Sequence, residues 1–578
     1  MASMGKQGSV WPKWQIALAV GTPLAIGLAY WYLRSCKYSK NEKPKNKDSE
    51  KKKESNAIGA EGDQEGTVSQ DPYEKAKSYK NKGNRFFKDG KYEKAIECYT
   101  EAIGICPPSK INDMATFYQN RAAASENLRN YDEVIEDCSR AIELNKTYIK
   151  ALLRRAKAYE ATNKHWESFE DLTAVCILEN FQNMNTLQTT DRVLKTLSKA
   201  KAKELVNTQP KELPSKHFIT NYFISFCDDP VLKEVLEYKK QEGKDPSKLR
   251  GYELVIHLLA EEQYEEVIPA CTDEIERNGE RLAEALLVRG TFNLLKCDME
   301  ATKSDLTRLV EMKEANVKLR VNALIKIGAL KVQYEQMENA LKDFDEAIKL
   351  DPSNADVYLH RGQIMLLTDN MEQTLSDMEK SVAANPDFPS ARVQKCYVQY
   401  RNALNHHDEK KVQAVLEEFE QILEQMSTST ECLLLYAQVL CEREEYEKAN
   451  ELFKKVEELS PFDPNAYVHK GILVLQWKQD INEAISLLNK AIELDSKCQF
   501  AYETLGSIEV QRGNMSRGIE LYQKAINLAH NEIELAHLVS LHDAAKAQLR
   551  VAERLNIPVG VFPTANTEYH IGSELRKD

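Results

Sequence analysis

The stretch 321–352, VNALIKIGALKVQYEQMENALKDFDEAIKLDP, decides the fold of this chain. Small residues stand at Gly328, Ala340 and Ala347, an aromatic residue at Phe344 and a proline at Pro352. In a unit of about 34 residues these are positions 8, 20, 27, 24 and 32. Small side chains let two helices approach closely, and the aromatic ring fills the space toward the next pair. The stretch therefore predicts a helix–turn–helix pair that stacks on further pairs.

The same pattern recurs along the chain. It continues at Gly362 and Pro386, and it appears again at Gly83, Ala95, Tyr99, Ala102 and Pro107, at Ala437, Ala449, Phe453, Pro461 and Gly471, and at Gly506, Gly518, Tyr522 and Ala525. This period is that of the tetratricopeptide repeat (TPR). We therefore predict an all-α TPR helix–turn–helix solenoid in two blocks, with one N-terminal transmembrane helix. Such solenoids present a long concave surface that holds peptides and proteins.

One segment near the N-terminus is long enough to cross a membrane. Residues 14–33 carry no charge and would form a helix of about 30 Å. Nine Lys or Arg follow in 34–53, whereas 1–13 contains only Lys6 and Lys13. Positive charge stays on the cytosolic side, so the bulk of the chain is expected in the cytosol. The middling hydropathy and basic flank favour a mitochondrial outer-membrane anchor, and an endoplasmic reticulum anchor is the alternative.

Charge is unevenly distributed between the two blocks. Residues 1–66 have a net charge of +4 and 71–206 of +3, although the whole chain carries -12. The second block is therefore strongly acidic. The asymmetry suggests two different ligands, and the acidic block favours basic clients.

Composition and register predict the domain limits. The predicted parts are a short segment expected in the intermembrane space (1–13), a transmembrane signal anchor (14–33), a basic, polar tether (34–70), a first TPR domain with a capping helix (71–206), a linker (207–246), an acidic C-terminal TPR domain (247–556) and a tail (557–578). Within the linker, Phe218, Tyr222, Phe223 and Phe226 lie at helical spacing. We expect an amphipathic helix packed on a neighbouring domain, and an exposed aromatic binding patch is the alternative.

Five polar residues converge on one face of the first block. The set consists of Lys80, Asn84, Asn120, Lys150 and Arg154. Lys80 and Asn84 are four residues apart on one helix, as are Lys150 and Arg154, so each pair shares a helix face. Asn120 and Arg154 are 34 residues apart and hold the same repeat position. Three cations and two amides suit a ligand with two neighbouring carboxylates, because arginine can fork onto one of them.

These five residues match, without substitution, the dicarboxylate clamp of co-chaperone TPR domains. The wider chain, with segments such as FYQNRAAA (117–124) and LQWKQD (475–480), resembles the mitochondrial outer-membrane import receptors of the seventy-kilodalton Tom family in its animal form. The resemblance implies that the clamp binds the acidic tails of the seventy- and ninety-kilodalton heat-shock chaperones. It also implies that the second block receives carrier-type precursor proteins with internal targeting signals, for transfer to the outer-membrane translocase pore. No precursor-contacting residue is assigned.

Two other functions are alternatives to this one. The first is a membrane-anchored TPR co-chaperone of another organelle, such as the endoplasmic reticulum, with the same clamp and different cargo. The second is an enzyme with a TPR arm, but the sequence contains no phosphate-binding Gly-rich loop, Gly-x-Ser-x-Gly or His-Glu-x-x-His motif. The twelve cysteines include no Cys-x-x-Cys pair, which favours reduced, buried thiols. We therefore predict no enzyme activity, no catalytic residue, no cofactor, no metal site and no nucleic-acid partner.

Overall fold

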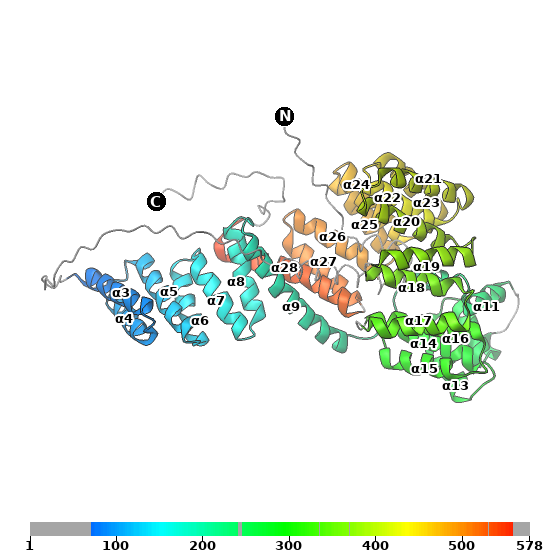
Figure 1. Cartoon of the computed structure of the whole chain (residues 1–578), viewed down its shortest axis with the longest axis horizontal. Coiled ribbons are helices and arrows are strands. Elements are labelled where there is room, and N and C mark those ends of the chain that lie inside the picture. The colour runs from blue at the N-terminus through cyan, green and yellow to red at the C-terminus, as the bar shows by residue number, and fades with distance from the viewer. Residues whose placement is uncertain (1–70, 241–245, 334–335, 369, 530, 559–578) are drawn as a thin grey trace. The chain divides into compact units, whose positions relative to one another are not determined.

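The computed structural model describes residues 71–240, 246–333, 336–368, 370–529 and 531–558, and every regular element in these ranges is helical (Figure 1). The predicted anchor and tether lie outside the described residues, as does most of the predicted tail. None of the described helices combines the length and the apolar character that a bilayer crossing requires.

The described chain divides into two compact units. The N-terminal unit comprises 71–201, 509–520 and 539–558, and the C-terminal unit comprises the described residues of 202–508 and 521–538. The division falls within α9, α26, α27 and α28, whose bounds follow.

Consecutive helix pairs form the N-terminal unit. Its helices are α3 (Pro72–Lys88), α4 (Tyr92–Ile105), α5 (Ile111–Asn127), α6 (Tyr131–Leu144), α7 (Ile149–Ala161), α8 (His165–Leu178) and the greater part of α9 (Met184–Thr208). The predicted small-residue contacts are present in the first pair. Ala95 and Ala102 are fully buried, and a methyl group added to Gly83 would lie only 2.7 Å from Cε1 of Tyr99. The repeat therefore depends on glycine where the two helices cross.

A buried ion pair joins the two helices of several repeats. In each, one arginine donates from Nε and Nη2 to both oxygens of an aspartate 16 residues later, at 2.6–2.9 Å. The pairs are Arg121–Asp137, Arg155–Asp171, Arg289–Asp305 and Arg361–Asp377. The aspartate side chains are at most 6% exposed. A two-point contact of this kind satisfies both oxygens of a buried carboxylate and fixes the geometry of the pair.

The C-terminal unit continues the repeat architecture. Its elements are α10 (Lys216–Ile224), α11 (Pro230–Lys239), the short 3-10 helix η1 (Pro246–Lys248), α12 (Gly251–Ala260), the 3-10 helix η2 (Tyr264–Glu266), α13 (Val267–Glu276), α14 (Leu282–Leu295), α15 (Met299–Glu311), α16 (Val317–Gln333), α17 (Met337–Leu350), α18 (Ala355–Leu367), α19 (Met371–Ala384), α20 (Pro389–Asn405), α21 (Glu409–Gln425), α22 (Thr430–Glu442), α23 (Tyr446–Leu459), α24 (Pro464–Trp477), α25 (Ile481–Leu494), and parts of α26 (Gln499–Gln511), α27 (Met515–Leu528) and α28 (Glu532–Leu555).

The segment predicted as a linker, 207–246, is part of this unit where the structure describes it, at 207–240 and 246. It forms α10 and α11, and Tyr222, Phe223 and Phe226 are buried in the core with residues of α12 to α18. Their burial confirms the packed amphipathic helix and excludes an exposed patch of these three rings. The ammonium group of Lys326, 1% exposed, lies 5.2 Å from the centre of the Phe226 ring.

The last helix, α28 (Glu532–Leu555), is divided between the two units, which differs from the predicted domain limits. The predicted C-terminal domain covers 247–556, whereas Val539 and the following residues of α28 belong to the N-terminal unit. Val551 is fully buried in a cluster with residues of α5 to α8. Arg554 lies 3.5 Å from the Asp171 carboxylate. The apolar stripe and the basic residues of this half of the helix thus pack on the first block.

The cysteines of the described ranges are free thiols. Cys98, Cys138 and Cys271 are among those that are buried, as predicted. Burial raises the pKa of Cys138 to about 12, so its thiol stays protonated near neutral pH and serves as a small apolar side chain.

Candidate functional site

The five residues predicted to form the clamp lie on the first helix of three successive repeats. Lys80 and Asn84 are on α3, Asn120 is on α5, and Lys150 and Arg154 are on α7. Hydrogen bonds of Asn84, Asn120 and Arg154 join these three helices, and Lys80 and Lys150 each lie four residues before one of these side chains on the same helix. We call the surface that carries these five residues the clamp face.

Asn84 is held by a hydrogen bond from the partner helix. The Tyr99 hydroxyl donates to Asn84 Oδ1 at 2.8 Å, and Asn120 Nδ2 approaches the same oxygen at 3.5 Å. Burial raises the pKa of Tyr99 to about 12, so the phenol keeps the proton that it donates. The Asn84 oxygen is therefore occupied within the protein, which leaves its amide NH₂ as the group that it presents to a ligand.

Arg154 is braced by two groups of α5. Its Nε donates to Glu126 Oε2 at 2.7 Å, and its Nη1 donates to the Gln119 backbone carbonyl at 3.3 Å. The Arg154 side chain is 20% exposed and that of Glu126 31%. The guanidinium is thus held in place while it still reaches the surface.

The two lysines differ from Arg154 in having no partner. The side chains of Lys80 and Lys150 make no hydrogen bond or ion pair with any residue in the described part of the chain. Lys80 is half-buried and Lys150 is exposed. Uncompensated ammonium groups on a face that also carries an arginine and two amides favour an anionic ligand.

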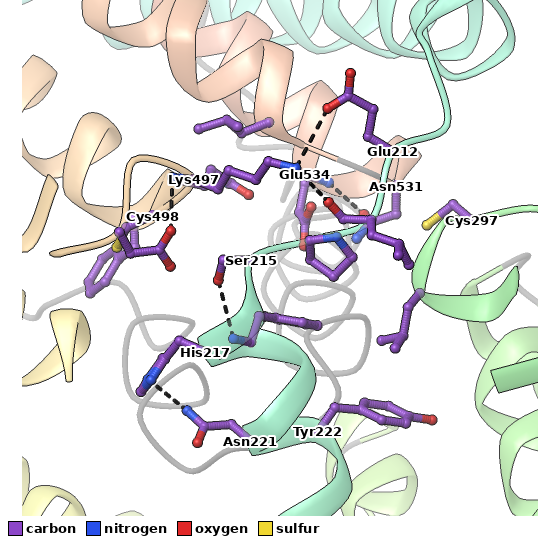
Figure 2. A pocket seen from close by; sticks show the side chains of 18 of the residues that line it. Glu212, Ser215, His217, Asn221, Tyr222, Cys297, Lys497, Cys498, Asn531 and Glu534 are labelled. Carbon is purple, nitrogen blue, oxygen red and sulfur yellow. Dashed lines mark hydrogen bonds and ion pairs between the residues drawn. The ribbon is translucent and has the colours of Figure 1, made fainter. Parts of the chain in front are cut away.

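A second candidate site is a pocket of about 560 Å³ in the C-terminal unit (Figure 2). Part of its lining is apolar, with Leu213 before α10, Phe218 and Tyr222 on α10, Leu294 and Leu295 on α14, and Phe500 on α26. Figure 2 shows α10, with His217, Asn221 and Tyr222, along one side of the pocket. The pocket is large enough to take several side chains of an unfolded segment.

The charged groups of the pocket are mainly acidic. Its lining includes the carboxylates Glu212, Asp495, Glu503 and Glu534 and a single lysine, Lys497. Lys497 lies 3.6 Å from Glu212 and donates to the Leu213 carbonyl at 2.9 Å (Figure 2). Since one lysine faces four carboxylates, the pocket combines an apolar lining with an excess of negative charge.

Sequence reasoning missed the Arg–Asp pairs of the fold and two features of the sites, the Glu126 contact and the pocket. The Arg–Asp pairs had a detectable signal, because both residues recur at fixed repeat positions 16 residues apart. Glu126 had a weaker signal in the sequence, since a second glutamate, Glu160, stands 34 residues later at the same repeat position. The pocket left no signal in the sequence, because its lining comes from segments far apart in the chain.

Comparison with family models supports the repeat assignment. Residues 76–108 match the tetratricopeptide repeat model and 328–368 a TPR repeat model. Residues 371–537 match the model of the tetratricopeptide repeat protein 21 C-terminal ARM domain. The fold therefore places the chain in the class of TPR solenoid proteins, whose concave surfaces bind peptides and proteins.

Two full-length relatives narrow this class to one family. The mitochondrial import receptor subunit TOM70 of Rattus norvegicus is 44% identical over 576 residues, covering 96% of this chain and 94% of the relative. That of Homo sapiens is 44% identical over 567 residues, covering 94% and 93%. The chain belongs to the TOM70 family of mitochondrial import receptor subunits. The crystal structure of the yeast Tom70 aligns with a TM-score of 0.46 at 23% identity, covering 83% of this chain and 99% of that one.

Proposed function

We propose that this import receptor docks cytosolic heat-shock chaperones of seventy and ninety kilodaltons by their acidic C-terminal tails. In this proposal it is anchored in the mitochondrial outer membrane by 14–33, with its N-terminus in the intermembrane space and its bulk in the cytosol. It receives carrier-type precursor proteins with internal targeting signals and transfers them to the translocase pore. Its role is to hold other proteins and involves no catalysis.

The observation that carries the proposal is the unpaired positive charge of the clamp face. Lys80 and Lys150 have no partner in the described part of the chain, and they lie four residues before Asn84 on α3 and Arg154 on α7. A C-terminal Asp residue offers two carboxylates a few ångströms apart, which is the ligand chemistry that two ammonium groups and a guanidinium fit. In this proposal the asparagine amides bond the extended backbone of the peptide.

The test is the affinity of the full-length protein for a fluorescent peptide that ends in Glu-Glu-Val-Asp. Arg154→Ala is expected to weaken binding by about 1.5–3 kcal/mol, the value of a charged hydrogen bond. Arg140→Ala is the matched control, because Arg140 is 58% exposed on α6 and its ion pair among the described residues is with the exposed Glu143. Equal affinity of Arg154→Ala and the control for the peptide would show that Arg154 does not bind it. An amidated peptide, which lacks the terminal carboxylate, should also bind more weakly.

The second part of the proposal assigns the pocket of the C-terminal unit to precursors. Its apolar lining fits the hydrophobic side chains of an internal targeting signal, and its four carboxylates favour lysine or arginine next to them. This combination matches the expectation of basic clients for the acidic block.

The pocket assignment is tested with a 20-residue apolar peptide flanked by lysines. Phe218 is a half-buried ring of the pocket lining, and Phe218→Ser is expected to weaken peptide binding about tenfold, given the value of a partly buried aromatic side chain. Phe462→Ser is the control, because Phe462 is 78% exposed and lies outside the lining. Equal effects of the two substitutions would refute the assignment.

A further inference from the structure

The clamp face contains a carboxylate of its own. Glu126 lies on α5, six residues after Asn120, and its Oε2 accepts from Arg154 Nε at 2.7 Å. Arg154 is the only arginine among the five predicted clamp residues. The group best suited to fork onto a ligand carboxylate is therefore already in contact with an anion of the protein.

The contact occupies one edge of the guanidinium. A side-on two-point contact to a carboxylate uses Nε together with Nη2, as in the buried Arg155–Asp171 pair. Glu126 occupies Nε, and the Gln119 carbonyl occupies Nη1. A ligand carboxylate that approaches Arg154 side-on meets a neighbouring negative charge and a donor that is already in use.

A second Glu–Arg pair in the N-terminal unit connects two helices without involving a predicted clamp residue. Glu160 has the same repeat position as Glu126, and it accepts from both Nη1 and Nη2 of Arg192 at 2.5 and 2.9 Å. Both pairs join the first helix of one repeat to the next helix along the row. Arg192, on α9, is not one of the predicted clamp residues, so the Glu160 pair connects helices without entering the clamp face.

We infer that Glu126 is an internal competitor for Arg154, which lowers the affinity of the clamp face for acidic peptide tails and thereby sets its selectivity. This inference rests on the proposed function of the clamp face. A ligand must displace the Glu126 carboxylate or bind beside it. A tail with several carboxylates compensates for that repulsion through Lys80 and Lys150, whereas a peptide with a single terminal carboxylate compensates less.

Charge and positioning can be separated by two substitutions of Glu126. Glu126→Gln keeps an amide oxygen that can accept from Arg154 Nε and removes the negative charge. Glu126→Ala removes both the charge and the brace. If Glu126 acts as a competitor, the glutamine variant binds the tail more tightly than wild type. If Glu126 mainly positions Arg154, the alanine variant binds more weakly and the glutamine variant, which keeps the hydrogen bond to Arg154 Nε, binds about as tightly as wild type.

The experiment measures the affinity of full-length wild type, Glu126→Gln, Glu126→Ala and Glu160→Gln for the Glu-Glu-Val-Asp peptide. Glu126→Gln is expected to bind about three- to tenfold more tightly, the scale of a partly exposed charge interaction. Glu160→Gln makes the same chemical change one repeat along and should stay within about twofold of wild type. The gain of Glu126→Gln should shrink at high salt, because screening weakens the repulsion that it removes.

The outcomes separate this inference from the proposed function. If wild type does not bind the peptide, the proposed docking function fails. If wild type binds and Glu126→Gln binds equally or more weakly, docking stands and the competitor role of Glu126 is overturned. An equal gain in Glu160→Gln would also overturn it, since the effect would then be a general consequence of lost negative charge. A gain confined to Glu126→Gln supports the inference, and a peptide with a single terminal carboxylate should then show a larger gain.

Discussion

Gly83→Ala tests whether the close crossing of α3 and α4 supports both the stability and the geometry of the clamp face. The new methyl group would lie 2.7 Å from Cε1 and 3.0 Å from Cδ1 of Tyr99, whereas carbon atoms in contact prefer about 3.5–4.0 Å. Tyr99 is only 2% exposed, so its ring cannot move outward into solvent. The ring, the helix or both must shift.

The expected magnitude is a difference of two opposing effects. Overpacking of this kind costs about 1–3 kcal/mol, and replacing a helical glycine by alanine recovers about 1 kcal/mol. A net destabilisation of about 0–2 kcal/mol is therefore expected for Gly83→Ala. Gly104→Ala is the matched control in the same repeat, because nothing lies within 4 Å of the new methyl group. The control should stabilise by about 0.5–1 kcal/mol.

The two variants are compared by urea unfolding and by hydrogen exchange of the α3 and α4 amides, which reports this repeat separately from the rest of the chain. Because the Tyr99 hydroxyl holds Asn84 at 2.8 Å, Gly83→Ala should also weaken binding of the acidic peptide, and Gly104→Ala should not. If Gly83→Ala proves as stable as Gly104→Ala and binds the peptide equally well, the tight crossing does not constrain the clamp face.

Two further predictions concern buried carboxylates. Asp171→Ala leaves Arg155 without its buried partner and should cost about 3–5 kcal/mol in the N-terminal unit, measured by thermal unfolding; a loss below 1 kcal/mol would contradict the importance of the pair. The buried Glu431 carboxyl accepts from Ser390, and burial raises its pKa from 4.5 to about 7. Because the native carboxyl holds its proton more tightly than the unfolded one, the resulting stability is complete below about pH 4.5 and is lost as the pH rises through 7. Glu431→Gln should therefore flatten the decline in stability between pH 5 and 8, and an unchanged decline would assign it to other groups.

Much of the fold could be predicted because the repeat is a local rule. Gly83, Tyr99 and Ala102 lie within one unit, and their contacts depend only on the packing of two consecutive helices. The helix faces of Lys80, Asn120 and Arg154 followed from the same register. Repetition at a fixed spacing turns positions in the sequence into positions in space, which allowed five residues on three helices to be placed on one face.

What the sequence could not supply were contacts without a fixed spacing. The Glu126–Arg154 contact depends on side-chain conformation, which the register does not determine. The pocket depends on how α10 packs beside residues that follow it by up to 320 positions, such as His537. The packing of Val551 against the first block also joins distant parts of the chain. In each case tertiary packing, rather than the local period, decides the result.

The Arg–Asp pairs have a consequence for how such an array can change its length. The arginine and the aspartate of each pair lie 16 residues apart within a single TPR repeat. A duplication of one unit copies the arginine and its aspartate together, and a deletion removes them together. The number of repeats can therefore grow or shrink during evolution without leaving an unneutralised charge in the interior. A point mutation of either the arginine or the aspartate does leave such a charge.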